Sequence, residues 1–450
     1  AIFFCLSGIK YDGHNYIDEA INNGAKVIVY SKEIADKDRA IFIKVQNVNN
    51  TLNKIANKFY YYPNEKVDTY VVSGNYGKSS VATFINYYLN SVSSCAYIGI
   101  LGINYSDSRL KSSFSTLNIL ENIRLLDNIR NKGIGSCTFE ASVRQLNLQK
   151  LDCIDPNFFI YTCTNRTSSD FYSDDYYIQL RKYLYTLEDD CRVILNIDDE
   201  SYGQVSDCVA GHVTYGFNSE ATYRIKDLGI SQNGSRFRIV YEGQTYEFIT
   251  NLQGISSVYN LAAAIAALNQ KGHDMKDLAE KFRHAEQVDG VMERVDDEYD
   301  IIIDSAYDVY SIEQICKYAN LVKQRNKAIG VISINYSDGD SRLQKIVETC
   351  EKYLDVIILT ENESLEGEVM NILDRCSRFS RTNKVVHCPM RSIAIENAID
   401  LLNRNDVLLI IGKGNEMFLE MGLGKEYYHG DRYYARKFID KRRREENEAC

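Results

Sequence analysis

The segment VVSGNYGKSS, residues 71–80, combines residue types that can bind a phosphate group. An apolar run leads into two glycines, a lysine and two hydroxyl residues, namely Gly74, Gly77, Lys78, Ser79 and Ser80. Small residues let backbone N–H groups approach an anion, a following helix is electropositive at its N-terminus, and a hydroxyl can bind Mg²⁺. Nucleotide binding is therefore the first hypothesis. An ordinary strand–turn–helix corner is the alternative, because Val72 stands where the GxxxxGK[ST] pattern has its first glycine.

The composition is typical of a soluble cytoplasmic enzyme. The chain has 450 residues, of which 45% are hydrophobic, so roughly two to four domains with large cores are expected. A net charge of −10 argues against a nucleic-acid partner, and the basic run KRRR at residues 441–444 is expected to be a solvated tail. No apolar run is long enough to span a bilayer, so no membrane association is expected.

The cysteines and the first residues give two further expectations. Twelve cysteines are scattered without a CxxC pair, which predicts reduced, packed thiols rather than a disulfide or zinc framework. The chain opens at Ala1 inside the strand-like run IFFCL, with no initiator methionine and no signal peptide. We therefore expect that its natural N-terminus is missing.

Strand-like runs alternate with helical patterns along the chain, which predicts an α/β fold with mostly parallel sheets covered by helices. Three blocks emerge, with predicted boundaries at residues 1–66, 67–296 and 297–450. In the second block, FRIVYEGQTYEFI has the alternation of an antiparallel patch. The third contains five successive strand candidates: YDIIIDSA, KAIGVISI, DVIILT, KVVHC and DVLLIIG.

Short motifs follow one another in a fixed order along these blocks: FFCLSGIKYDGHNYIDEAINNGAKVIVYS, SGNYGKSS, STLNILENIRLL, FEAS, TNRTSSDFY, QLRKYLY, RVILNIDDE, GISSVYNLAAAIAA, VMERV, IIIDSAYDVYSIE and IIGKGNE. In type, order and spacing they resemble the Mur ligase family from end to end. Within that family they are most similar to the ligases that add the third amino acid to UDP-N-acetylmuramoyl-dipeptide (MurE-like).

The resemblance implies a small N-terminal α/β domain that binds uridine, a central P-loop-type ATPase domain and a C-terminal Rossmann-like domain. It also implies ATP-dependent amide formation in peptidoglycan precursor synthesis. A substrate carboxylate attacks the γ-phosphate of ATP to form an acyl phosphate, and the amine of a free amino acid then displaces phosphate. ATP and Mg²⁺ are the expected cofactors, and UDP-N-acetylmuramoyl-peptide and a free amino acid the expected partners of a monomeric enzyme.

Residue roles follow from the motifs. Lys78 would bind phosphate, Ser79 a first Mg²⁺ and Glu140 a second, because a hard cation prefers carboxylate oxygen. Lys182 matches the family's carbamylated lysine, and by residue type alone it would be a helix-surface lysine. Arg294 completes the expected catalytic set of Lys78, Lys182, Glu140 and Arg294.

The remaining expected contacts fall into three groups. The nucleotide would be bound by Gly74, Asn75, Gly77, Lys78, Ser79, Ser80, Asn260 and Asp304. The other substrates would be bound by Ser115, Thr116, Ser142, Lys413 and Glu416, and the metal ions by Ser79, Glu140, Asp170 and carbamylated Lys182. For Asn260 the alternative is a local helix cap, and for Lys413 and Glu416 it is a solvated loop.

Several motif positions depart from the family. Its recurrent histidines are replaced by Arg144, Tyr307 and Asn415, and Ser169 and Asp170 occupy the stretch of the metal-binding histidine. Asp170 would still suit Mg²⁺. Tyr76 and Leu117 replace the usual asparagine of the phosphate loop and a proline beside Thr116.

The loop from Thr360 to Glu368 lacks the arginine of the family's diaminopimelate motif and contains Glu361, Glu363, Glu366 and Glu368. Bidentate hydrogen bonding to a distal carboxylate would require a guanidinium group. An acidic loop attracts an amine instead, so a basic amino acid such as lysine is expected to be preferred. The alternative is that these glutamates form a solvated helix start.

Other functions stay open from the sequence. The main alternative to a working ligase is a catalytically weakened paralogue that binds nucleotide or UDP-sugar and acts as a regulatory protein. A relative acting on folate or poly-glutamate acceptors is disfavoured by the DGHNYI segment. The amidating, lipid-linked branch is disfavoured because the chain lacks its four-cysteine zinc ribbon.

Overall fold

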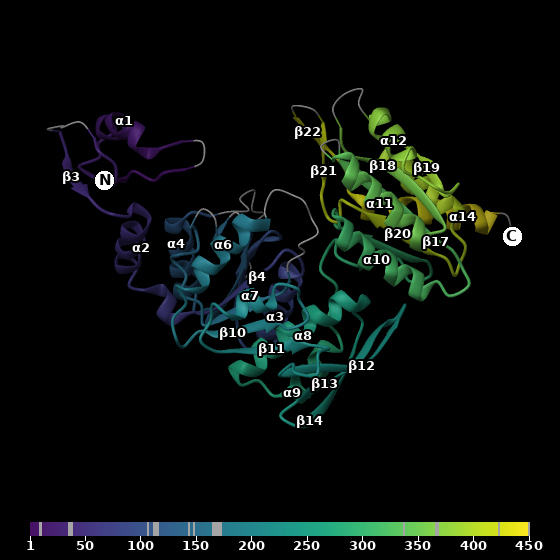
Figure 1. The fold of residues 1–450 in the computed structure, drawn as a ribbon, viewed down its shortest axis with the longest axis horizontal. Coiled ribbons are helices and arrows are strands. Elements are labelled where there is room, and N and C mark those ends of the chain that lie inside the picture. Colours follow the sequence, from purple (N-terminus) through teal and green to yellow (C-terminus); the bar gives the residue numbers. More distant parts are fainter. Residues whose placement is uncertain are drawn as a thin grey trace. The chain divides into compact units, whose positions relative to one another are not determined.

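The computed structural model describes residues 1–8, 11–34, 39–105, 108–110, 117–142, 145–146, 149–163, 173–335, 338–364, 369–421 and 424–448. Within these ranges the chain forms two compact units (Figure 1). The first contains Ala1–Thr164, Asp170–Thr214 and Ala266–Gly272, and the second contains Tyr215–Ile265 and His273–Cys450. The α/β class and the mostly parallel central sheet predicted from the sequence are confirmed. The domain boundaries at residues 66 and 296 stay a prediction.

The N-terminal part of the first unit is a small parallel sheet in the order β1-β2-β3. Its elements are β1 (Ile2–Phe4), η1 (Gly13–Tyr16), α1 (Ile17–Asn22), β2 (Val27–Tyr30), β3 (Ile41–Lys44), α2 (Val48–Phe59) and η2 (Pro63–Lys66). Helix α1 ends at Asn22, and Gly24 follows with a φ of 91°. A left-handed glycine just beyond a helix end is the usual way to turn the chain.

The large central sheet has the strand order β14-β13-β12-β11-β10-β9-β4-β8-β5-β6-β7 among the described residues. Strands β10, β9, β4, β8 and β5 run parallel, whereas β6 and β7 and the pairs within β12 to β14 are antiparallel. The strands are β4 (Asp68–Ser73), β5 (Cys95–Gly99), β6 (Gly102–Tyr105), β7 (Ser108–Leu110), β8 (Ser136–Ala141), β9 (Phe158–Tyr161), β10 (Arg192–Asn196), β11 (His212–Gly216), β12 (Tyr223–Ser231), β13 (Gly234–Tyr241) and β14 (Gln244–Thr250). The accompanying helices are α3 (Lys78–Val92), α4 (Ile119–Asn131), α6 (Ser173–Leu184), α7 (Tyr202–Ser206), α8 (Gly254–Lys271) and α9 (Met275–Phe282).

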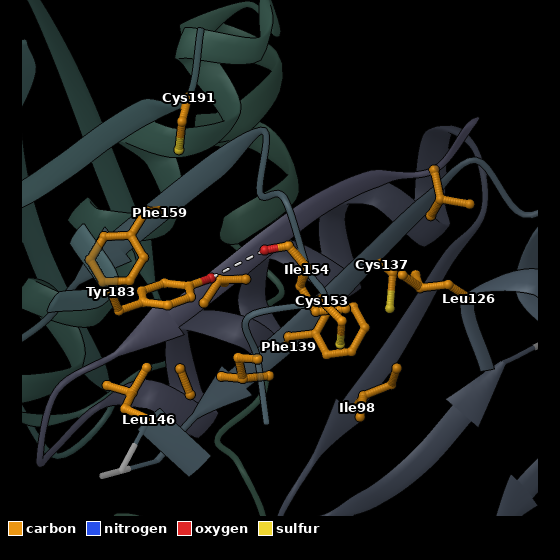
Figure 2. Close-up of a cluster of buried hydrophobic side chains, with 14 of the residues drawn as sticks. Ile98, Leu126, Cys137, Phe139, Leu146, Cys153, Ile154, Phe159, Tyr183 and Cys191 are labelled. Atoms are coloured by element: carbon orange, nitrogen blue, oxygen red, sulfur yellow. Dashed lines mark hydrogen bonds between the residues drawn. The ribbon is translucent and has the colours of Figure 1, made fainter. Parts of the chain in front are cut away.

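Side-chain alternation decides which face of this sheet each residue joins. Val71, Ile98 and Phe139 pack into one hydrophobic core with residues of α4 and α6. Figure 2 shows part of this core, where the ring of Tyr183 lies beside that of Phe159 and its hydroxyl points to the carbonyl of Ile154. Residues of the opposite parity, which include Glu140, lie on the other face of the sheet.

The third sheet, in the second unit, has the order β15-β16-β20-β17-β18-β21-β22, with β19 paired to β18. Its strands are β15 (Glu293–Arg294), β16 (Asp300–Asp304), β17 (Ala328–Asn335), β18 (Val356–Ser364), β19 (Val385–His387), β20 (Val407–Ile411), β21 (Phe418–Met421) and β22 (Gly424–Tyr427). Its helices are α10 (Val309–Val322), α11 (Asp340–Tyr353), α12 (Val369–Ser377), α13 (Arg391–Leu401) and α14 (Asp431–Glu448). All five predicted strands are present, and the β21–β22 hairpin was not predicted.

The helices of the third sheet divide between its two faces, again by alternation along the strands. Ile302, Ile332 and Leu409 pack with α10, α11 and α12, whereas their neighbours of opposite parity pack with α13 and α14. Such a sheet, apolar on both faces, needs helices on each side. The predicted Rossmann-like character of this block follows from that arrangement.

The basic run at residues 441–444 is not the solvated tail that its charge suggested. It lies within α14, where Arg442 donates to the carbonyls of Ile399 and Leu402 and Arg443 pairs with Asp296 at 2.8 Å. Both guanidinium groups also lie over the ring of Tyr299. The local charge pattern could not predict these contacts, because the partners of Arg442 and Arg443 are far away in sequence.

Within the part of the chain that the structure describes, no helix is both long enough and apolar enough to cross a membrane.

Candidate active site

The phosphate-loop segment has the backbone that its glycines allow. Strand β4 ends at Ser73 and α3 begins at Lys78, and the turn between them contains Gly74 with a φ of 130° and Gly77 with a φ of 79°. Residues with a side chain rarely adopt these angles. A Cβ at Gly74 would also lie 2.1 Å from Thr162 Oγ1. The chain therefore enters α3 through a turn in which Gly74 is sterically required.

A neighbouring strand end holds this loop in place. Thr162, just after β9, donates its hydroxyl to the carbonyls of Ser73, at 3.1 Å, and Tyr76. The backbone N–H of Asn75 donates to the carbonyl of Cys163 at 2.7 Å. Sequence reasoning did not single out Thr162. The one sequence feature that could have indicated it is its position at the end of a buried strand, because ligands bind near the carboxyl ends of parallel strands.

Lys78 lies half-buried at the first position of α3, and its Nζ donates to the carbonyl of Asn75 at 3.0 Å. Burial lowers the pKa of this ammonium, while the nearby Glu140 and Cys163 act in the opposite direction. Phosphate oxygens would replace the carbonyl with a stronger, charge-assisted partner. The hydrogen bond from Lys78 to Asn75 is therefore one that a bound phosphate could replace.

Glu140 lies at the loop because of the strand register. It is the fifth residue of β8 and pairs with Val72 of β4, next to the loop. Ser79 Oγ donates to Glu140 Oε2 at 2.8 Å, and Glu140 is only 6% exposed. The sequence assigned these two residues to different Mg²⁺ ions, whereas the structure places their side-chain oxygens in direct contact.

These two oxygens fit Mg²⁺. An octahedral Mg²⁺ with bonds of about 2.1 Å has adjacent oxygen ligands about 3.0 Å apart, close to the 2.8 Å separation of Ser79 Oγ and Glu140 Oε2. Both are hard oxygen donors, and Mg²⁺ commonly takes one or two protein oxygens and fills its shell with phosphate and water. Among the described residues no group of three or more His, Cys, Asp or Glu side chains is arranged to hold a metal ion. Within the described residues, Ser79 and Glu140 would therefore be completed as a divalent-ion site by phosphate and water.

Tyr97 of β5 is a further partner of Glu140 that the sequence did not reveal. Its hydroxyl donates to Glu140 Oε1, which also accepts the backbone N–H of Ile100 at 3.3 Å. Burial, and secondarily the charge of Glu140, raises the pKa of the Tyr97 hydroxyl well above its ordinary value. The hydroxyl therefore stays protonated and remains a donor.

The other predicted residues of the first unit are not all described. Ser115, Thr116 and Asp170, like Arg144, lie outside the described residues. Ser142 follows β8 and shares two hydrogen bonds with the Gln145 side chain, so it caps a local turn. Lys182 lies on α6 beside the buried Tyr183, and its own side chain is exposed. Its carbamylation stays a prediction.

In the second unit, Asn260 lies in the second turn of α8, which begins at Gly254. It is half-buried and too far along the helix to act as the N-terminal cap considered above, so that alternative is wrong. Contact with adenine stays a prediction.

Arg294 lies on β15 and is held by groups of its own unit. Its guanidinium is 3.8 Å from the buried carboxylate of Asp300, and it donates to the carbonyls of Gln232 at 3.5 Å and Asp297 at 3.3 Å. Burial raises the pKa of Asp300, and Arg294 and Gln232 oppose that shift. A phosphate-binding role would require Arg294 to exchange these partners.

Asp304 ends β16, as predicted, and its carboxylate accepts backbone N–H groups from Met292 and Ala306, each at 2.7 Å. Burial is nevertheless the largest influence and raises its pKa to about 6. Met292 has a positive φ of 47°. Asp304 thus links the residue just before β15 to the segment that follows β16.

Lys413 is not part of a solvated loop. Its side chain is 1% exposed and lies 3.3 Å from Glu416, whose side chain is 63% exposed. The loop packs so tightly that a Cβ on Gly290 would lie 2.3 Å from the backbone nitrogen of Asn415. The predicted pair is therefore adjacent, with one member buried and one facing solvent.

Two family descriptions match the chain. The Mur ligase middle domain matches residues 72–268, and the catalytic domain of the Mur ligase family matches residues 1–60. The first includes Lys78, Ser79 and Glu140, the residues whose geometry fits a phosphate and a metal ion.

Curated relatives are similar over nearly their whole length. The UDP-N-acetylmuramoyl-L-alanyl-D-glutamate–2,6-diaminopimelate ligase of Fusobacterium nucleatum is 25% identical, with 99% of this chain and 92% of the relative covered. The enzyme of that name from Clostridioides difficile is 27% identical, covering 98% and 92%. UDP-N-acetylmuramyl-tripeptide synthetase 2 of Oceanobacillus iheyensis is 28% identical, covering 96% and 90%.

Solved structures are similar in fold. A UDP-N-acetylmuramoyl-L-alanyl-D-glutamate–2,6-diaminopimelate ligase superposes with a TM-score of 0.71 at 19% identity, covering 98% of this chain and 92% of that one. The MurF ligase of Thermotoga maritima in complex with ADP gives a TM-score of 0.64 at 14% identity, covering 98% and 94%.

Proposed function

The chain belongs to the Mur ligase family, and on that premise we propose that it is an ATP-dependent ligase that adds an amino acid to a UDP-N-acetylmuramoyl-peptide. The observation that carries this proposal is the cluster at the phosphate loop. There Lys78 lies next to the paired oxygens of Ser79 and Glu140, at the carboxyl edge of a parallel sheet. Phosphoryl transfer requires a positively charged side chain and a metal-ion site next to each other at the phosphates.

Lys78 would hold the β- and γ-phosphates of ATP through its ammonium while the loop N–H groups contact their oxygens. The carboxylate of the acceptor peptide attacks the γ-phosphorus, ADP leaves, and an acyl phosphate forms. The amine of the incoming amino acid then attacks the acyl carbon, loses its proton and expels inorganic phosphate. Lys78 stabilises the charge that gathers on the transferred group in the first step.

Mg²⁺, held by Ser79 and Glu140, would supply charge neutralisation on the phosphates. Glu140 contributes by presenting a carboxyl oxygen at the loop, and Ser79 by a hydroxyl at the start of α3. Carbamylated Lys182 is proposed to share a metal ion with Glu140, and Asp170 is proposed as a further metal ligand. Because the substrates of this reaction are intracellular metabolites, we expect the enzyme to be cytoplasmic.

A phosphate-release assay tests the function. Full-length protein is given Mg-ATP and UDP-N-acetylmuramoyl-L-alanyl-D-glutamate with each of a panel of amino acids, and each substrate is omitted in turn as a control. We expect release that requires all three substrates and a new UDP-tripeptide in the product mixture. Nucleotide binding without release for any amino acid would contradict the ligase and support the weakened paralogue instead.

A further inference from the structure

The carboxylate of Glu140 is held at both of its oxygens by groups from separate elements. Oε1 accepts the Tyr97 hydroxyl from β5 and the Ile100 backbone N–H just beyond that strand. Oε2 accepts the Ser79 hydroxyl from α3 at 2.8 Å. The oxygen next to the phosphate loop thus has a single donor that a cation could displace, whereas the far oxygen has two.

The contact between Tyr97 and Glu140 follows from the sheet. Tyr97 pairs with Thr138 across β5 and β8, so Glu140 is its diagonal neighbour on the same face. Tyr97 is 3% exposed, and a buried hydroxyl or carboxylate is costly unless it has a hydrogen-bond partner. Each side chain therefore provides the hydrogen-bond partner that the other needs.

Gly99 leaves the room that this contact occupies. A Cβ at Gly99 would lie 2.2 Å from Glu140 Oε1 and 2.5 Å from the Tyr97 hydroxyl oxygen. Any larger residue would separate the two groups. The contact between Tyr97 and Glu140 therefore depends on glycine at position 99.

We propose that Tyr97 is a positioning residue that holds Glu140 Oε1 so that Oε2 faces Ser79 and is ready for a divalent cation. This inference rests on the proposed function, in which Ser79 and Glu140 bind that cation. Groups that hydrogen-bond to a metal-ligating carboxylate fix its orientation, and their loss typically weakens metal binding about 10- to 100-fold. Tyr97 touches neither phosphate nor substrate in this account.

The test is a titration of full-length protein with Mn²⁺ in the presence of a non-hydrolysable ATP analogue, with free Mn²⁺ followed by electron paramagnetic resonance. Tyr97→Phe is expected to raise the Mn²⁺ dissociation constant about 10- to 100-fold, with metal-free binding of the analogue unchanged. Tyr70→Phe is the matched control, because Tyr70 is equally buried on β4, the strand on the other side of β8, and its hydroxyl has no hydrogen-bond partner among the described residues. That control should bind Mn²⁺ as the wild type does.

The Glu140→Gln variant distinguishes failure of this inference from failure of the proposed metal site. If Tyr97 acts through Glu140, Tyr97→Phe should add no further loss to Glu140→Gln. Wild-type Mn²⁺ affinity in Tyr97→Phe, or a full additional loss in the double variant, would overturn the inference. Wild-type affinity in Glu140→Gln would instead overturn the proposed metal site itself.

Gly99→Ala provides a second route should Tyr97→Phe not fold. It keeps both side chains but crowds their contact, so it is expected to weaken Mn²⁺ binding in the same direction. Unchanged Mn²⁺ affinity in a folded Gly99→Ala protein would count against the proposal.

Discussion

The phosphate loop of the first unit and the strand-end segments of the second unit hold their polar side chains in different ways. At the loop, Lys78 and Ser79 each make a bond that a ligand could replace, to the Asn75 carbonyl and to Glu140. In the second unit, Asp304 accepts two backbone N–H groups and Arg391 is paired with Asp431 inside the protein. The first arrangement is suited to receiving a ligand, whereas the second maintains the fold around its own loops.

The largest expected effect is on turnover at the loop. Lys78→Ala removes the ammonium that would stabilise the transferred phosphate, so kcat/KM should fall by about a thousandfold or more, roughly 4 kcal/mol. Steady-state phosphate release measures this. The fold should persist, because the hydrogen bond of Lys78 is to the carbonyl of Asn75 within its own loop, and thermal melting checks that. A variant that keeps wild-type kcat/KM would remove the phosphate loop from the mechanism.

In the second unit the corresponding effect is on stability. Arg391 donates to both oxygens of Asp431, at 2.7 and 2.6 Å, and Tyr428 donates to the same carboxylate. Arg391→Leu leaves a buried carboxylate without its cation, so the free energy of unfolding should fall by about 3–5 kcal/mol.

Urea unfolding measures this loss. Arg236→Leu is the control, because Arg236 pairs with Glu247 on an exposed strand face and exposed ion pairs contribute little. Equal losses in the two variants would contradict the claim that the Arg391 pair maintains the fold.

Asp304 should give the second unit a distinct dependence on pH. Its folded pKa, about 6, lies above the ordinary 3.8 because of burial, and Asp308 adds to the shift. Its contribution to stability is therefore fully present below pH 3.8 and is lost as pH rises through 6, by about 3 kcal/mol.

The comparison of wild type with Asp304→Asn isolates this titration. Unfolding free energies at pH 4 and pH 7 should show the wild type losing stability relative to the variant as pH rises. A constant difference at the two pH values would mean that Asp304 does not titrate in this range.

Sequence and structure agree best where function depends on local pattern. The glycines, Lys78 and Ser79 of the loop lie within a few residues of one another, so a motif was enough to predict their shared site. Glu140 was found through its motif, and the register of β4 and β8 explains why it reaches the loop. The strands of the second unit were recognised because each is a continuous apolar run.

The residues that the sequence did not reveal act across strands. Tyr97 and Thr162 are ordinary members of buried strands, and only the pairing of β5 with β8 and of β9 with β4 brings them to Glu140 and the loop. The loop that contains the buried Lys413 likewise packs tightly, through Gly414 and Asn415, against the distant Gly290. Three-dimensional neighbours of this kind have no fixed spacing along the chain.

The smallest expected effect concerns the choice of amino acid. The acidic segment after Thr360 should favour an amine, so lysine is expected to compete better than meso-diaminopimelate in one assay. The sequence predicted a loop from Thr360 to Glu368, but Glu361 and Glu363 belong to β18, and residues 365–368 lie outside the described residues. Arg342, which follows β17, could supply a guanidinium instead, but it is 3.2 Å from Asp338 and donates to the Tyr307 carbonyl. Tenfold or greater preference for diaminopimelate, about 1.4 kcal/mol, would contradict the charge argument.

The most direct test of the loop as the nucleotide site is amide hydrogen exchange of the full-length wild type, with and without Mg²⁺ and a non-hydrolysable ATP analogue. If the phosphates bind as proposed, backbone N–H groups of residues 74–80 become donors to phosphate oxygens and their exchange slows. Binding of the analogue, established by calorimetry in the same buffer, without slower exchange in residues 74–80 would contradict the account.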